Sequence, residues 1–169
     1  TGGTLTGSQP IAVTDVFSDA PDWSPDGSQL VYMTSPNSGW ELHRYSLATS
    51  AVFRVPNISP WIREPKWSPD GQKILFSADP GNDGNHDIYV VDVDGSNLTQ
   101  LTSNPFYEGD PAWSPDGQQI VFTSYANDNN DLFIMNLDGS GLVQLTYDPD
   151  DDFQPAWSPD GSRIAFVST

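Results

Sequence analysis

The sequence predicts an all-β fold made of repeated four-stranded antiparallel units, and three observations support this prediction. The pentapeptide Trp-Ser-Pro-Asp-Gly occurs four times, beginning at Trp23, Trp67, Trp113 and Trp157. Each copy is followed by a short apolar run rich in β-branched and aromatic residues, which favours a strand. No segment shows the i, i+3, i+4, i+7 apolar spacing of an amphipathic helix, so a helical repeat is excluded.

Each unit is predicted to contain two hairpins. The first strand ends at the Trp, and Ser-Pro-Asp-Gly forms a turn because Pro fixes φ and Gly accepts a positive φ. The second strand is the apolar run, such as 74–76, and the third begins at Asp87 or Asp131. Asp-Gly-Ser at 94–96 and 138–140 marks the second hairpin. Four-stranded units that recur at this spacing indicate a β-propeller, in which each unit is one blade.

The ends of the chain lead to a prediction about one blade. The repeats span about 15–55, 56–102, 103–146 and 147–169, and the last one stops after its second strand. Residues 6–14 align without gaps on 138–146, so we expect 1–14 to supply the missing strands. One blade would then be completed by strands from both termini. The chain 1–169 would be either a closed four-bladed propeller or half of an eight-bladed ring formed by a homodimer.

The order of these motifs resembles the TolB-like β-propeller repeat over nearly the whole chain. The motifs are Pro-Ala-Trp-Ser-Pro-Asp-Gly, an apolar strand, Asp-Ile-Tyr-Val, Asp-Gly-Ser and Leu-Thr. The resemblance implies a disc of blades around a channel, used as a scaffold that binds proteins or peptides in the periplasm or outside the cell. The same repeat also forms the regulatory, non-catalytic domain of some hydrolases. Propellers of this family usually have six or more blades, whereas this chain has four repeats.

Composition excludes several classes of function. The chain has 6 Lys and Arg against 23 Asp and Glu, a formal net charge of −17, which opposes nucleic-acid and anionic-membrane binding. There is no cysteine, so a thiolate zinc site and a cysteine nucleophile are excluded. No apolar run is long enough for membrane insertion. With only His43 and His86 as imidazole bases and no Gly-rich phosphate loop, the sequence predicts a non-enzyme that requires no cofactor.

The predicted binding surface is the face of the propeller that carries the channel mouth. Connections between blades, and between the second and third strands of a blade, lie on this face and contain 14 of the 23 acidic residues. Loops on a rigid scaffold often carry binding residues, so we expect a protein or peptide partner here, and the acidic charge favours a basic one. The residues predicted to contact it are Trp40, Trp61, Arg63, Glu64, Tyr107, Asp110, Tyr125 and Phe153.

Two acidic segments on the same face suggest an alternative, a calcium-dependent or carbohydrate-binding propeller. Closely spaced Asp and Asn oxygens can ligate calcium, although neither segment matches the usual calcium-loop motif. An ordinary polar loop, in which Asp and Asn bind their own backbone, explains the same pattern. The candidate calcium ligands are Asp79, Asp83, Asp87, Asp150, Asp151 and Asp152.

Charge is distributed unevenly along the chain. Five of the six basic residues fall between Arg44 and Lys73, whereas 74–162 contains 16 acidic residues and no Lys or Arg. One side of the disc is therefore predicted to be strongly acidic and the other nearly balanced.

Overall fold

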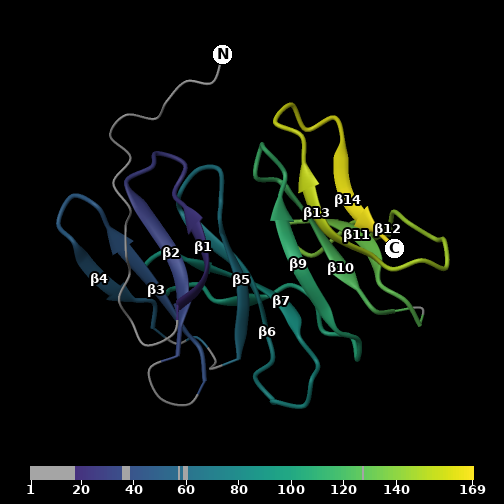
Figure 1. Ribbon diagram of the computed structural model, residues 1–169, viewed down its shortest axis with the longest axis horizontal. Coiled ribbons are helices and arrows are strands. Elements are labelled where there is room, and N and C mark those ends of the chain that lie inside the picture. The colour runs from purple at the N-terminus through teal and green to yellow at the C-terminus, as the bar shows by residue number, and fades with distance from the viewer. Residues whose placement is uncertain (1–17, 36–38, 57, 59–60, 127) are drawn as a thin grey trace.

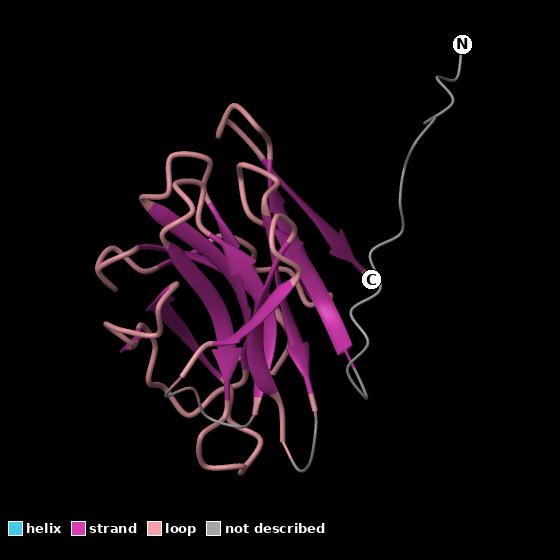
Figure 2. Cartoon of the chain, turned by 90° about the vertical axis from the view of Figure 1, so that its left-hand side faces the viewer, coloured by secondary structure: helices cyan, strands magenta, loops and turns pink. Residues whose placement is uncertain are grey.

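The computed structural model describes residues 18–35, 39–56, 58, 61–126 and 128–169. This part of the chain contains strands, turns and loops, as Figure 2 shows, and no helix in it is long and apolar enough to cross a membrane. The strands are β1 (Ser18–Trp23), β2 (Gln29–Thr34), β3 (Glu41–Ser46), β4 (Ala51–Arg54), β5 (Ile62–Trp67), β6 (Lys73–Ala78), β7 (Asp87–Asp92), β8 (Thr99–Gln100), β9 (Glu108–Trp113), β10 (Gln119–Ser124), β11 (Asp131–Asn136), β12 (Val143–Gln144), β13 (Asp152–Trp157) and β14 (Ile164–Ser168).

The strands form four antiparallel sheets that follow one another along the chain (Figure 1). Sheet 1 contains β1–β4, sheet 2 contains β5–β8, sheet 3 contains β9–β12, and sheet 4 contains β13 and β14. The first strands of successive sheets are neighbours: β1 contacts β5, β5 contacts β9, and β9 contacts β13. The strands of sheets 1 and 4 do not contact each other in the described part of the chain. The structure thus confirms the all-β fold with four-stranded antiparallel sheets.

The repeated pentapeptide forms the turn between the first two strands of each sheet. In sheet 2, Gly71 N–H donates to the Ser68 carbonyl (2.9 Å), and the Ser68 hydroxyl donates to Asp70 Oδ1 (2.6 Å). Equivalent bonds occur in the other three sheets. Hydrogen bonds from the serine side chains, followed by backbone N–H groups, lower the pKa of Asp26 and Asp160 to about 2. These aspartates therefore stabilise the turns.

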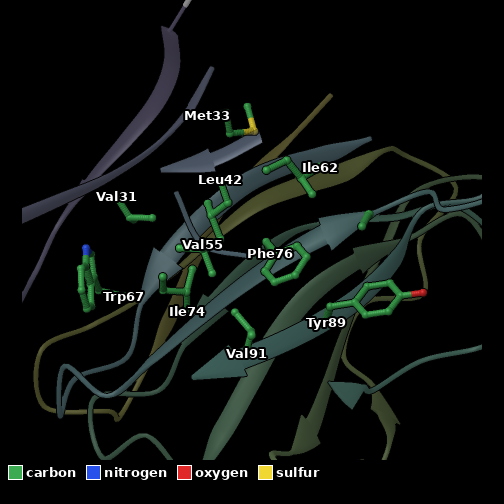
Figure 3. Close-up of a cluster of buried hydrophobic side chains, with 11 residues drawn as sticks. Val31, Met33, Leu42, Val55, Ile62, Trp67, Ile74, Phe76, Tyr89 and Val91 are labelled. Atoms are coloured by element: carbon green, nitrogen blue, oxygen red, sulfur yellow. The ribbon is translucent and has the colours of Figure 1, made fainter. Parts of the chain in front are cut away.

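The hydrophobic core lies between neighbouring sheets. Figure 3 shows the cluster between sheets 1 and 2, where Val31 and Leu42 face Ile74 and Phe76. Leu75 lies between Ile74 and Phe76 in β6, and it belongs to the second cluster, between sheets 2 and 3. Alternate side chains of one strand therefore pack on opposite neighbours. This explains the continuous apolar runs in the sequence, because both faces of the strand are buried.

The motif tryptophans take part in packing between sheets. Trp67 is 6% exposed and its backbone N–H donates to Asp22 Oδ2 (2.8 Å) in the preceding sheet. The indole N–H of Trp113 donates to the Lys66 carbonyl (3.2 Å). Trp23, in the first sheet, is 50% exposed and lines one pocket together with Trp67 and Trp113. The tryptophan thus links consecutive sheets by both apolar contact and hydrogen bonds.

Sheet 4 contains only two of the expected four strands among the described residues. Its β14 side chains Phe166 and Val167 are 44% and 43% exposed, whereas the equivalent Phe76 and Phe122 are buried. Residues 1–14, which we predicted to complete this blade, lie outside the described residues. Completion of the blade therefore stays a prediction.

Candidate functional site

Four equivalent residues along the inner strands share an unusual backbone conformation. Ala20, Glu64, Asp110 and Gln154 each precede a proline and have φ values of 48°, 54°, 49° and 53°. Each lies where the pairing of its strand with the second strand of the sheet is interrupted by a bulge. A positive φ is unfavourable for residues other than glycine, and such positions concentrate at functional sites.

The bulges turn backbone N–H groups toward the preceding sheet, where acidic side chains accept their hydrogen bonds. Asp110 N–H donates to Glu64 Oε2 (2.6 Å), and Gln154 N–H donates to Asp110 Oδ2 (3.2 Å). We call Ala20, Glu64, Asp110 and Gln154 the inner ladder. Burial, and then the charge of Asp110, raises the pKa of Glu64. The ladder therefore connects the sheets and concentrates negative charge at their inner edge.

A second group of polar side chains lies beside the ladder, between sheets 2 and 3. The rings of His86 and Tyr107 are 5.3 Å apart, and Arg63 is close enough to influence the pKa of both side chains. Burial, and then the Glu64 carboxylate, raises the pKa of Tyr107. Burial and the Arg63 charge lower the pKa of His86. Four of the predicted binding residues, Arg63, Glu64, Tyr107 and Asp110, are thus brought together.

A pocket of about 310 Å³ opens on the other side of Arg63, between sheets 1 and 2. Trp40, another predicted binding residue, is half-buried in its wall. The lining residues are Asp19, Ala20, Met33, Trp40, Ile62, Arg63 and Glu64. The pocket therefore combines an aromatic ring, a guanidinium and carboxylates.

The remaining predicted binding residues lie elsewhere. Trp61 and Tyr125 are exposed, and Phe153 is half-buried in β13. Tyr125 N–H donates to the Tyr107 carbonyl (3.0 Å), which holds the loop after β10 beside the polar group. None of these three lines the pocket. They are therefore separate positions around the predicted surface.

The connections between the second and third strands and those between sheets meet on one side of the molecule, which we call the loop face. The Asn85 side chain donates to the Asn104 carbonyl (3.0 Å), and Asn129 donates to the carbonyls of Asp148 and Asp150 (3.0 and 2.9 Å). These bonds tie the two kinds of connection together at sheets 2 and 3, and we call the acidic loops that they join the acidic rim.

The first predicted calcium segment is organised by hydrogen bonds of its own. Asp79 is buried and accepts from Gly84 N–H (2.8 Å) and Asp83 N–H (3.3 Å). Burial alone would raise the pKa of Asp79, but these N–H groups bring it below its usual value. Asp87 is buried too and accepts from the Gln100 side chain (2.9 Å) and the Thr102 hydroxyl (3.5 Å). Burial raises the pKa of Asp87.

The second predicted calcium segment is divided between surface and interior. Asp150 is exposed, and Asp151 Oδ1 accepts from the backbone and side-chain N–H groups of Asn130 (2.8 and 3.0 Å). Asp152 is completely buried, and neither of its carboxylate oxygens has a hydrogen-bond partner among the described residues. Within the described ranges, no three His, Asp or Glu side chains are grouped so that they could hold a metal ion. Calcium binding stays a prediction.

Sequence reasoning missed two features of this region. Ala20 and Gln154 were not singled out as site residues, although each stands before the proline that precedes the motif tryptophan, as Glu64 and Asp110 do. That shared position was the available signal. Glu108 was also missed: it is buried at the start of β9 and accepts a hydrogen bond from the Asn104 side chain. Nothing in the local sequence indicates its burial.

Comparisons with known proteins agree with this architecture. The chain aligns with a TolB from Acinetobacter baumannii (TM-score 0.78, 23% identity), covering 89% of this chain and 37% of that chain. It aligns with a TolB-like protein of Agrobacterium tumefaciens (TM-score 0.80, 25% identity), covering 93% and 60%. An oligogalacturonate lyase from Vibrio parahaemolyticus shares the fold (TM-score 0.65, 16% identity), covering 85% and 44%.

The chain thus spans between about a third and three fifths of the length of these two TolB structures. A search of curated protein sequences finds no significant match. The family model of the TolB β-propeller domain matches residues 7–169, which is nearly the entire sequence. The chain therefore belongs to the TolB β-propeller domain family.

Proposed function

We propose that this chain is a non-catalytic scaffold that binds a protein or peptide partner through its loop face, outside the cytoplasm. The resemblance to TolB-like propellers implies this kind of role and location. The imidazoles also support it: His43 contacts Glu41 (3.0 Å), and His86 is buried against Tyr107. Neither arrangement resembles a base held beside a nucleophile.

The observation that carries the proposal is the exposed acidic rim of the loop face. Asp83, Asp128, Asp148 and Asp150 are exposed on its loops, and none of them has an ion-pair partner among the described residues. The aromatic side chains Phe106, Tyr125 and Tyr147 are exposed on the same loops. Carboxylates beside aromatic rings attract Lys and Arg side chains through charge and cation–π contacts. The rim therefore favours a partner segment that carries basic residues.

We expect a synthetic peptide rich in Lys and Arg to bind, and its Glu-substituted counterpart not to bind. Binding should weaken as salt rises, because exposed charges are screened. Replacing Asp128, Asp148 and Asp150 together by Asn should reduce the affinity by about tenfold or more. Isothermal titration calorimetry at low and high salt measures both effects.

The matched control changes the same number of charges on the opposite side of the molecule. Asp94, Asp116 and Asp138 lie in tight turns there, and Asn at each position keeps a side-chain oxygen for the turn hydrogen bonds. This triple variant should bind the basic peptide with unchanged affinity. Equal losses in the two triple variants would show that only net charge matters, and the proposed surface would be wrong.

We further propose that residues 1–14 complete sheet 4 and that the propeller closes as a homodimer with eight blades. The exposed β14 side chains and the absence of contact between the described strands of sheets 1 and 4 support an assembly. Light scattering should give a particle of twice the chain mass of 18.5 kDa. A particle with the mass of one chain would contradict the dimer.

A further inference from the structure

Ala20 interrupts the inner ladder of side-chain acceptors. At the later junctions, the backbone N–H groups of Asp110 and Gln154 each meet a carboxylate from the preceding sheet. At the junction of sheets 1 and 2, the corresponding donor is Glu64 N–H, and the corresponding side chain is the methyl group of Ala20. No described side chain accepts a hydrogen bond from Glu64 N–H. The same backbone donor thus occurs at three junctions between sheets. At two of them, a side chain of the protein accepts its hydrogen bond.

The position where Ala20 lacks an acceptor side chain lies at the pocket between sheets 1 and 2. Both Ala20 and Glu64 line this pocket of about 310 Å³. Met33 and Ile62 are buried and supply apolar wall, and the half-buried Trp40 adds an aromatic surface. The break in the ladder therefore coincides with space for a ligand that has an apolar body.

Arg63 supplies a positive charge at this junction. The equivalent residues of the other inner strands are Asp19, Gly109 and Phe153, so only strand β5 has a cation at this position. Arg63 lines the pocket, and its guanidinium has five N–H donors, so it has the capacity to bind a carboxylate there.

The two carboxylates of the pocket wall are each held by a backbone hydrogen bond. Asp19 Oδ1 accepts from Ala20 N–H (2.7 Å), and Glu64 Oε2 accepts from Asp110 N–H (2.6 Å). These bonds offset part of the repulsion that an anion would meet in the pocket. The same arrangement already exists one junction further on, where the Asp110 carboxylate lies beside that of Glu64.

We propose that this pocket binds a carboxylate-bearing ligand. The carboxylate takes the place of the missing acidic side chain opposite Glu64 N–H, Arg63 provides the second donor, and Trp40 packs against the apolar part. Either the C-terminal carboxylate of a peptide or an Asp or Glu side chain has this chemistry. The inference rests on the proposed peptide-binding role only in that both sites would serve one partner, whose basic residues would bind the acidic rim.

Three short peptides test the proposal, and they share one sequence except for a single Asp in the third. The first has an acetylated N-terminus, apolar side chains and a free C-terminal carboxylate; the second has a C-terminal amide instead. The third also has the amide but contains one internal Asp. Binding is measured by chemical-shift changes of backbone amide and tryptophan indole N–H groups in NMR. We expect the first, the third or both to shift Glu64 N–H and the Trp40 indole, and the amide peptide to leave them unchanged.

Ala20→Asp provides the sharpest variant. Ala20 and Glu64 are separated by 44 residues, as are Asp110 and Gln154, so the new carboxylate copies an existing rung of the ladder. Asp also tolerates a positive φ better than Ala does. The variant should melt at a higher temperature and bind the carboxylate peptides at least about tenfold more weakly. Arg63→Gln should weaken binding without the gain in stability.

Ala48→Asp is the matched control, because it adds the same charge at an exposed position in the turn between β3 and β4. It should change neither the melting temperature nor the binding. The proposal is wrong if the amide peptide binds as well as the acid, if Ala20→Asp binds normally, or if no carboxylate peptide shifts Glu64 N–H. The Asn variant of the acidic rim should still bind the carboxylate peptides, so failure of one site is distinguishable from failure of the other.

Discussion

Phe76→Ala should lower the free energy of unfolding by about 3–5 kcal/mol, the range for removing a large buried aromatic side chain. Phe76 is 1% exposed and packs in the cluster between sheets 1 and 2 (Figure 3). Its ring stacks on Tyr89 with centroids 5.9 Å apart. Alanine leaves a cavity between the two sheets, and sheet 2 cannot move freely to close it because its other face packs on sheet 3. Urea denaturation followed by tryptophan fluorescence measures the change.

Phe53→Ala is the control for this variant. Phe53 lies in β4 at the outer edge of sheet 1 and is about half exposed, with Arg44 over its ring at 5.7 Å. Its removal should cost less than about 1 kcal/mol, in the range of surface substitutions with weak contacts. If both variants lose the same stability, the contact between sheets 1 and 2 is not the main core that the structure shows.

Phe166→Ala extends this comparison to the completion of sheet 4. Phe166 occupies the position of Phe76, yet it is 44% exposed when only the described strands cover it. If residues 1–14 supply the two outer strands as proposed, the loss of stability should approach that of Phe76→Ala. A loss as small as that of Phe53→Ala would argue against the completed blade.

The strands and turns could be predicted from the sequence because their causes are local. Pro and Gly in the pentapeptide select the turn, and the apolar run after it must be buried on both faces, as Ile74 and Leu75 are. The inner ladder could not be predicted in the same way, since its hydrogen bonds join residues such as Glu64 and Asp110 in different sheets. Their residue types showed only that they were polar and close to the predicted face.

The candidate site was predicted in composition but not in geometry. Arg63, Tyr107 and Glu64 were expected on one face, and the structure adds that they share a junction and that Trp40 lies in a pocket on the other side. The importance of Ala20 depends on what it lacks, an acceptor that its counterparts supply. An absence of this kind becomes visible only when the sheets are placed side by side.

The deprotonation of Glu108 should make the protein lose stability as the pH rises from about 4.5 to about 6. Burial raises the pKa of Glu108 to about 6, hydrogen bonds from Thr102 and Asn104 oppose this, and the charge of Asp87 adds to it. The unfolded chain has the ordinary value of 4.5, so between these pH values the folded state binds more protons than the unfolded state. Stability in this interval therefore falls as pH rises, by about 1–2 kcal/mol in total.

Other groups titrate nearby, so the effect of Glu108 must be isolated by a variant. Burial raises the pKa of Asp87 and Glu64, so these groups also lower the stability as pH rises. The pKa of His86 is lowered, so His86 raises the stability as pH rises. The turn aspartates, such as Asp160 with a pKa of about 2, lose their stabilising effect only at lower pH. Glu108→Gln keeps the shape of the side chain and removes its titration.

Unfolding free energies of the wild type and Glu108→Gln should therefore diverge as pH rises from 4.5, and the difference should level off above about pH 7, with the variant gaining. Glu41→Gln is the control, because it removes one charge from the half-buried strand β3 and leaves Glu108 in place. Its unfolding free energy should keep the part of the pH dependence that Glu108 causes in the wild type. Parallel curves for the wild type and Glu108→Gln would mean that Glu108 is ionised at acidic pH in the folded protein. The Asn104 and Thr102 hydrogen bonds, rather than burial, would then control its charge.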